Sequence, residues 1–219
     1  DNLGAPHADP ENSLTIATWI IHISSLVEFL VAMGFCWRWA DTVQNPKWKG
    51  LTWGLIPLHS SGITACTYHL FYNQIPILVP LQAMLTCIGN ITAAFAAWRI
   101  AQSNGYSGDE LPFGLGKFLP QPSEGTQDSS VKTTAESESL IGFEDLGEAL
   151  RADTDYSFLV KLFAGCALAS YAIKYGELWL DFPFEANVSL GVTIILVPSL
   201  LNAFKWYKRS QDPTFEGWF

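Results

Sequence analysis

The chain lacks most of the features that mark an enzyme, a metal protein or a nucleic-acid binder. It has 12 Lys and Arg against 21 Asp and Glu, a formal net charge of -9, so we expect no binding of nucleic acid. Its four cysteines show no CxxC or other ligand spacing, and we expect small buried hydrophobic side chains there. Because no glycine-rich phosphate loop, nucleophile elbow or HExxH motif occurs, we expect no enzymatic activity and no protein-ligated metal ion.

Long apolar runs are what the sequence has in abundance. Hydrophobic residues make up 49% of the 219 residues, and nine of them are Trp. A helix needs roughly 20 residues to cross the ~30 Å hydrocarbon core of a membrane. Five runs reach this length, at about residues 13–37, 53–72, 76–98, 158–179 and 186–207. The sequence therefore predicts an all-α integral membrane protein with five transmembrane helices: an N-terminal helix and two hairpins.

Composition divides the chain into three regions. Residues 1–102 hold the first three runs, and residues 157–219 hold the C-terminal transmembrane hairpin and tail. Between them, residues 103–156 form an acidic, low-complexity extramembrane loop that includes QPSEGTQDSSVKTTAESES and could bury little by itself. Apolar residues at helical spacing between Leu140 and Leu150 predict one short amphipathic helix within this loop.

The basic residues predict how the five helices are oriented. If the N-terminus lies outside, eleven of the 12 Lys and Arg residues fall on the inner side, and Lys174 alone falls on the outer side. The positive-inside rule therefore predicts an outer N-terminus and an inner loop and C-terminus. The chain opens with Asp1, without a start Met or a basic stretch, and we expect that a targeting segment has been removed.

Polar side chains within the apolar runs are the candidates for function. They are His22 and Glu28 in the first run, His59 and His69 in the second, and Gln82 and Asn90 in the third. Such groups are costly when they face lipid, so we expect them to face other helices, a pigment or water. For each histidine, a hydrogen bond to a neighbouring helix is the alternative to a ligand-binding role.

One motif resembles a known family. The run WGLIPLHSSGITACTYHLFYN, followed by LQAMLTCIGNITAAFAAWRI, is similar to the hypothetical chloroplast frame forty-nine family of cyanobacterial and plastid membrane proteins, whose function is unassigned. The similarity covers about residues 13–102, and the rest looks like the longer plastid versions. The resemblance implies a multi-pass protein of the chloroplast thylakoid membrane, with a lumenal N-terminus and a stromal C-terminus. It implies no catalytic residues.

In a thylakoid, the intramembrane histidines acquire a specific candidate role. A neutral His can ligate the Mg of a chlorophyll through Nε2, and we expect this of His59 or His69, with His22, Glu28, Gln82 and Asn90 as further cofactor contacts. Chlorophyll, carotenoid and lipid are the ligands to expect. A haem between His22 and His69 is disfavoured, because the two lie about 4 Å apart in depth when the helices are counted at ~1.5 Å per residue.

These expectations favour a non-catalytic accessory subunit at the edge of photosystem I and its antenna. Its partners would be the membrane and photosystem core and antenna proteins, in a hetero-complex rather than a homo-oligomer. Two alternatives stay open: a photosystem assembly or biogenesis factor, and a small ion or proton pathway that uses Glu28 and His59.

Overall fold

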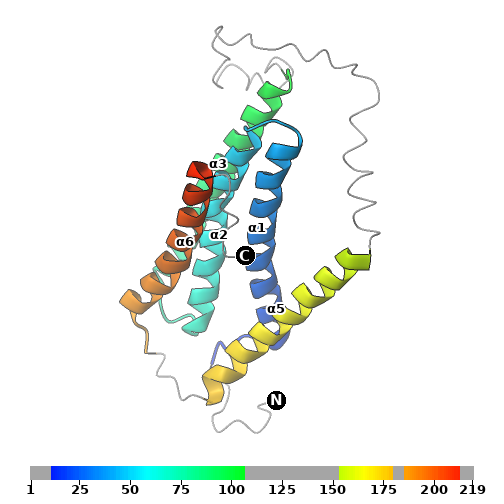
Figure 1. Ribbon diagram of the computed structural model, residues 1–219. Coiled ribbons are helices and arrows are strands. Elements are labelled where there is room, and N and C mark those ends of the chain that lie inside the picture. The colour runs from blue at the N-terminus through cyan, green and yellow to red at the C-terminus, as the bar shows by residue number, and fades with distance from the viewer. Residues whose placement is uncertain (1–10, 107–152, 180–184, 213–219) are drawn as a thin grey trace. The chain divides into compact units, whose positions relative to one another are not determined.

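The computed structural model describes residues 11–106, 153–179 and 185–212. This part of the chain is all-α (Figure 1), and its helices are α1 (Ile16–Thr42), α2 (Trp48–Leu70), α3 (Leu78–Ser103), α5 (Asp153–Trp179) and α6 (Val188–Gln211). The predicted all-α class is therefore confirmed. The amphipathic helix predicted between Leu140 and Leu150 and most of the acidic loop lie outside the described residues.

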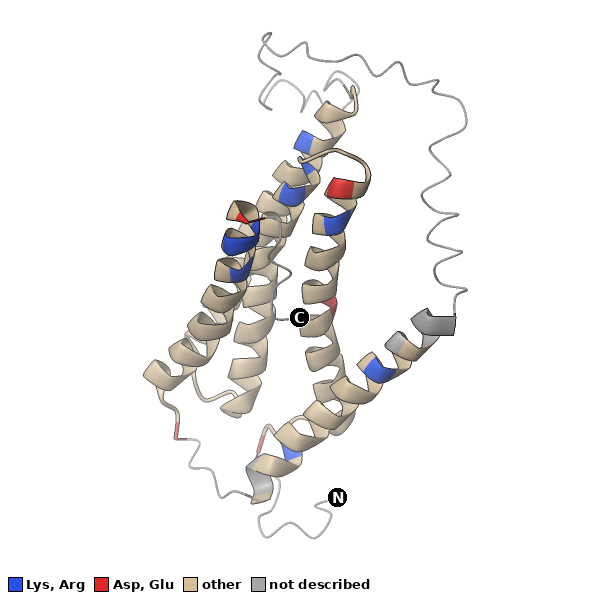
Figure 2. Cartoon of the chain, in the orientation of Figure 1, with Lys and Arg blue, Asp and Glu red and all other residues tan. Residues whose placement is uncertain are grey.

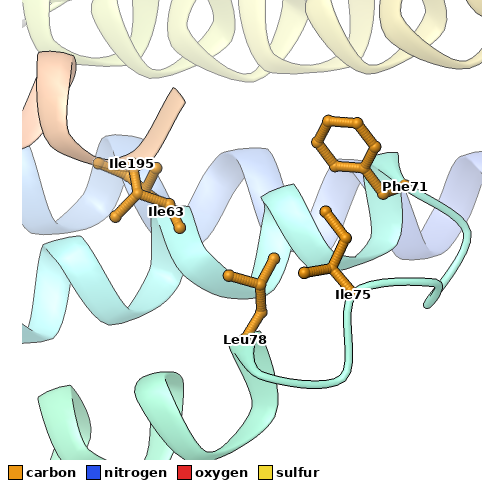
Figure 3. Packing of buried hydrophobic residues seen from close by; sticks show 5 residues of the cluster. All are labelled: Ile63, Phe71, Ile75, Leu78 and Ile195. Carbon is orange, nitrogen blue, oxygen red and sulfur yellow. The ribbon is translucent and has the colours of Figure 1, made fainter. Parts of the chain in front are cut away.

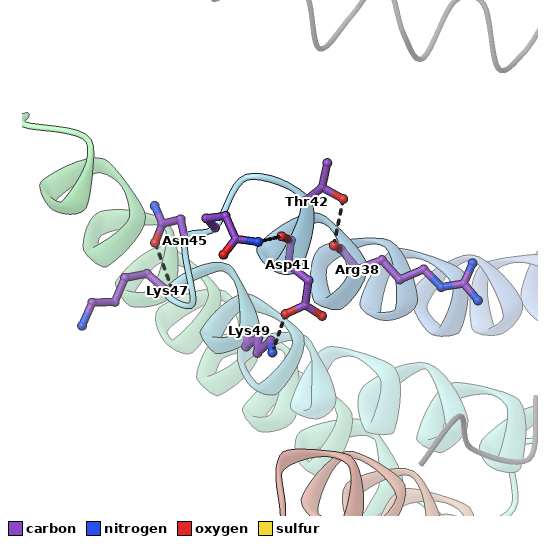
Figure 4. A network of polar contacts seen from close by, with 7 residues as sticks. Arg38, Asp41, Thr42, Asn45, Lys47 and Lys49 are labelled. Carbon is purple, nitrogen blue, oxygen red and sulfur yellow. Dashed lines mark hydrogen bonds and ion pairs between the residues drawn. The ribbon is translucent and has the colours of Figure 1, made fainter. Parts of the chain in front are cut away.

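Short polar segments set the helix ends. The Thr15 side chain accepts a hydrogen bond from the Thr18 amide at the start of α1, and Asn187 does the same for the Leu190 amide at the start of α6. Between α1 and α2, Asn45 Oδ1 accepts from the Lys47 amide at 3.1 Å (Figure 4). The predicted runs at residues 13–37 and 53–72 leave a connection that is too long. Only residues 43–47 lie outside the two helices, because Asn45 and Pro46 favour a turn.

The helix α2 lies at the centre of the packing and contacts α1, α3 and α6. The connections of residues 43–47 and 71–77 are short, so α1 and α3 run antiparallel to α2. The start of α6 packs on the end of α2, where Gly191 lies close to Thr67 and Phe71, and its Asn202 reaches His59 farther along. The helix α6 therefore also runs antiparallel to α2.

Two apolar clusters hold these helices together. One contains Ile63 of α2, Phe71 and Ile75 of the α2–α3 connection, Leu78 of α3 and Ile195 of α6 (Figure 3). The other joins α1 to α6, since the ring centroids of Trp37 and Trp206 lie 5.1 Å apart beside Met33. The second half of α5 belongs to the same unit, and there Lys174 donates to the Leu14 carbonyl at 2.8 Å.

Three of the described helices are long and apolar enough to cross a membrane: α1, α3 and α6. The central helix α2 is less apolar because it carries a series of buried polar residues, namely Thr52, His59, Ser60, Ser61, Thr64 and Thr67. These side chains lie among helices rather than on an outer face. The mean hydropathy of α2 is therefore lowered by polar residues that other helices cover.

Charge is distributed unevenly along α1, α2, α3 and α6. Their Lys and Arg residues gather at the end where α1 and α3 finish, α2 begins and α6 finishes (Figure 2). The cations at this end are Arg38, Lys47, Lys49, Arg99, Lys205, Lys208 and Arg209. We call it the basic end. One acidic residue there, Asp41, pairs with Lys49 at 2.7 Å (Figure 4).

Candidate functional site

His59 is enclosed by three helices. Only 4% of its surface is exposed, and Asn202 of α6 lies 3.5 Å from it, measured from Nδ2 to Nδ1. The Asn202 amide also approaches the Met33 sulfur of α1 at 3.5 Å, while its Oδ1 accepts from the Trp206 indole at 2.9 Å. His59 is thus part of a polar contact that joins α1, α2 and α6.

The direction of these hydrogen bonds fixes the tautomer of His59. The Trp206 indole can only donate, so the Asn202 oxygen must face it and the Asn202 NH2 must face His59. Nδ1 of His59 is then the acceptor, and its proton sits on Nε2. A protonated, enclosed Nε2 is poorly suited to ligate a chlorophyll, so the structure favours for His59 the hydrogen-bonding alternative.

His22 and His69 form a different arrangement. Their rings meet edge to face with centroids 5.0 Å apart, although they lie on different helices. His22 Nδ1 lies 2.9 Å from the Thr18 carbonyl oxygen, and His69 Nδ1 lies 3.0 Å from Asn73 Oδ1. Both rings are partly exposed.

Here the hydrogen bonds leave Nε2 available. A carbonyl oxygen can only accept, so Nδ1 carries the proton in His22, and the same holds for His69 opposite the Asn73 oxygen. Each Nε2 then keeps its lone pair, as a metal-ligating imidazole requires. In this structure the two rings are in direct contact with each other.

The polar stripe of α3 is only partly turned towards α2. Ser61 Oγ lies 2.6 Å from Thr86 Oγ1 and donates to the backbone carbonyl of Gln82 at 3.1 Å. The Gln82 residue is half-buried, while Asn90 is exposed on the surface of the chain. Thr86 rather than Gln82 or Asn90 therefore provides the side-chain contact of this stripe with α2.

Glu28 lies on an outward face of α1 and is exposed. Seven residues before and after it, Ile21 and Phe35 are 64% and 60% exposed, so the three share one face, since seven residues bring a helix back to within ~20°. No hydrogen bond or ion pair joins Glu28 to His59 in the described part of the chain, which leaves the proposed pathway between them without structural support.

The residue that sequence reasoning missed is Asn202. It is an amide in the apolar run of α6, and the same rule that selected Gln82 and Asn90 would have selected it. Among the described residues, no group of three or more His, Cys, Asp or Glu side chains could hold a metal ion.

Comparisons with known proteins bear on the first half of the chain. A family model described as a protein of unknown function, DUF2499, matches residues 13–99. A Ycf49-like protein of Synechocystis is 45% identical over 91 residues, which are 41% of this chain and 88% of that protein. The uncharacterized protein ycf49 of Cyanophora paradoxa is 33% identical over 87 residues, 39% of this chain and 85% of that protein. No solved structure matches the chain significantly.

Proposed function

The chain belongs to the Ycf49 family, and on this premise we propose that it is a non-catalytic accessory subunit of a thylakoid photosynthetic complex. Its proposed position is the edge of photosystem I and its antenna, where it docks larger subunits in a hetero-complex. Relatives from a cyanobacterium and from Cyanophora support a photosynthetic membrane, and three long apolar helices support membrane insertion. Chlorophyll is the proposed principal ligand, with carotenoid beside it.

The exposed Glu28 is the observation that carries the docking proposal. It lies one residue from the midpoint of Ile16–Thr42, on the same face as the exposed apolar side chains of Ile21 and Phe35. A carboxylate facing lipid near the bilayer centre costs about 2.5–3.5 kcal/mol on insertion scales. That penalty is avoided if a partner subunit covers this face and supplies a cation or a hydrogen-bond donor. The face around Glu28 is therefore the proposed docking surface.

The pigment proposal rests on His22 and His69. Both are partly exposed, and both are oriented through Nδ1 by an oxygen of the same chain. This fits the requirement of a chlorophyll Mg for one axial ligand from a neutral imidazole. His69 is the preferred ligand, because it was predicted from the sequence and retains its Nε2 lone pair in the fold. With a chlorophyll bound at His69, the protein would orient the pigment and perform no chemistry of its own.

The proposed topology has five transmembrane helices with a lumenal N-terminus. The basic end supports this orientation, since the Lys and Arg of four helices gather there and the positive-inside rule assigns such an end to the stroma. The helix α2 would cross as the covered centre of the group. Protease added to stroma-side-out thylakoids should then cut residues 103–156, and protection of that segment would overturn the orientation.

Native separation of gently solubilised thylakoids tests the proposal directly. The wild-type chain should migrate with a chlorophyll-containing complex, in constant proportion to its core subunits. Glu28→Leu should release it, whereas Asp41→Asn, a control at the exposed end of α1, should not. A wild-type chain that migrates alone would refute the subunit role, and association confined to immature complexes would favour an assembly factor instead.

Pigment content gives a second measurement. His69→Leu should lower the chlorophyll bound per chain, while His59→Phe should leave it unchanged if that protein still folds. Equal chlorophyll in the wild type and in the double variant His22→Leu/His69→Leu would exclude the pair as ligands. The docking result with Glu28 does not depend on this outcome.

A further inference from the structure

A small groove opens between α2 and α3 at the basic end. Its volume is about 200 Å³, and its lining includes Lys47, Gly50, Trp53, Phe95, Ala96 and Arg99. We call Lys47 and Arg99, which lie nearest the helix ends, its rim, and Trp53 and Phe95, which lie farther along α2 and α3, its sides. The groove exists because two small residues face each other: a Cβ on Gly50 would still lie 4.0 Å from Ala96 Cβ. None of these residues takes part in the docking or the pigment binding proposed above.

The rim carries positive charge that no acidic side chain in the described part of the chain neutralises. Lys47 and Arg99 are both exposed, and neither makes an ion pair within the described residues. Lys49 is different, since it pairs with Asp41 at 2.7 Å (Figure 4). Two uncompensated cations from different helices therefore border the same groove, at an end where further Lys and Arg gather.

The sides of the groove are apolar and lie farther along the helices. Trp53 is six residues after Lys47, which is about 9 Å along α2, and Phe95 is four residues before Arg99, about 6 Å along α3. Both rings are exposed, at 39% and 47%. A ligand in this groove would contact cations at one end and aromatic rings at the other. A membrane lipid has the matching arrangement, with a charged headgroup followed by apolar chains.

We propose that this groove is a binding site for an anionic membrane lipid. The negatively charged headgroup lies between the Lys47 ammonium and the Arg99 guanidinium, and the upper part of an acyl chain lies against Trp53 and Phe95. A free anion would use the rim alone and leave the aromatic sides uncovered, so a lipid uses more of the groove. The site requires membrane insertion but is independent of the docking and pigment roles.

Binding is measured on the purified full chain in nanodiscs, by native mass spectrometry and by the thermal midpoint. Phosphatidylglycerol should bind and raise the midpoint, whereas phosphatidylcholine should not. Each cation near a membrane surface contributes about 1 kcal/mol to the binding of anionic lipid, which equals about a fivefold change in affinity. The double variant Lys47→Gln/Arg99→Gln should therefore weaken binding about 25-fold. Lys49→Gln is the matched control and should leave binding unchanged.

A second variant keeps the charges and fills the groove. Gly50→Leu adds a side chain where only Ala96 is in van der Waals contact, so the fold should persist. Binding of phosphatidylglycerol should fall at least tenfold, while Gly34→Leu, at a position with nothing within 4 Å, should have no effect. Equal binding of the two lipids, an equal loss in Lys49→Gln, or complete displacement by millimolar inorganic phosphate would each overturn the proposal.

Discussion

Gly54 is the position at which a single added carbon should test the α2–α3 packing most directly. A Cβ built on Gly54 lies 2.9 Å from the Thr92 carbonyl oxygen and 3.1 Å from both Cα and N of Ala93. All three atoms belong to the backbone of α3, so no side-chain rotation can relieve the contact. In Gly54→Ala the two helices must therefore move apart.

The size of the effect follows from these distances. Ordinary carbon contacts begin at 3.4 Å, so the helices must separate by about 0.5 Å at this point. Overpacking of this kind costs roughly 1–3 kcal/mol. The same movement lengthens the hydrogen bond from Thr92 Oγ1 to the Gly54 carbonyl, now 2.9 Å, and an interhelical bond in a membrane contributes about 0.6 kcal/mol. A loss of about 2 kcal/mol is expected, or roughly 4–8 °C in the thermal midpoint.

The measurement is the thermal unfolding midpoint in a mild detergent, followed by circular dichroism. Gly34→Ala is the matched control, because Gly34 lies in a helix and a Cβ added there would meet nothing within 4 Å. It should match the wild type or exceed it by up to about 1 kcal/mol, because Ala favours a helix more than Gly does and meets no neighbour here. If Gly54→Ala melts together with Gly34→Ala, then α2 and α3 do not approach each other closely at this point.

Two further substitutions test the polar contacts between helices. Asn202→Leu removes the acceptor of the Trp206 indole and the partner of His59. Leaving these buried groups unpaired should lower the stability by about 1–3 kcal/mol. Ser199→Ala is the control and should have little effect on the thermal midpoint, because the Ser199 hydroxyl bonds only within α6. Ser61→Ala breaks the contacts with α3 and should cost about 0.6 kcal/mol in the same assay, and Ser60→Ala, which loses only a bond within α2, should cost less. Equal midpoints within either pair would argue against the interhelical bonds.

Much of the helical architecture could be predicted from the sequence. Apolar runs of the right length and a short connection around Asn73 predicted α1, α2 and α3 and the antiparallel α2–α3 hairpin. The predicted bounds were wrong at several helix ends: α1 continues to Thr42, α2 starts at Trp48, α3 continues to Ser103 and α5 starts at Asp153. Apolarity locates the part of a helix that can enter lipid, but capping residues decide where the helix ends.

The partners of individual side chains were much less predictable. Counting residues along each helix placed His22 and His69 about 4 Å apart in depth. Such a count does not show which faces of two helices contact each other. The structure brings their rings to 5.0 Å and instead turns His59 towards Asn202 on α6, 143 residues along the chain. Spacing within one helix defines a face, whereas the neighbour of that face depends on the packing of all the helices around it.

The position of α6 links these observations to function. Residues 13–99 match the family, and they include α1, α2 and most of α3 but not α6. Yet α6 provides Asn202, which accepts from Trp206 of the same helix, to His59, and it provides Ile195 to the cluster around Ile63. The region outside the family match therefore covers part of the polar surface of α2, at His59 and near Thr67, whereas Thr52 and Ser61 contact α1 and α3. Of the six polar residues selected from the sequence, Glu28 on α1 and Asn90 on α3 are exposed, and both lie outside the contact with α6.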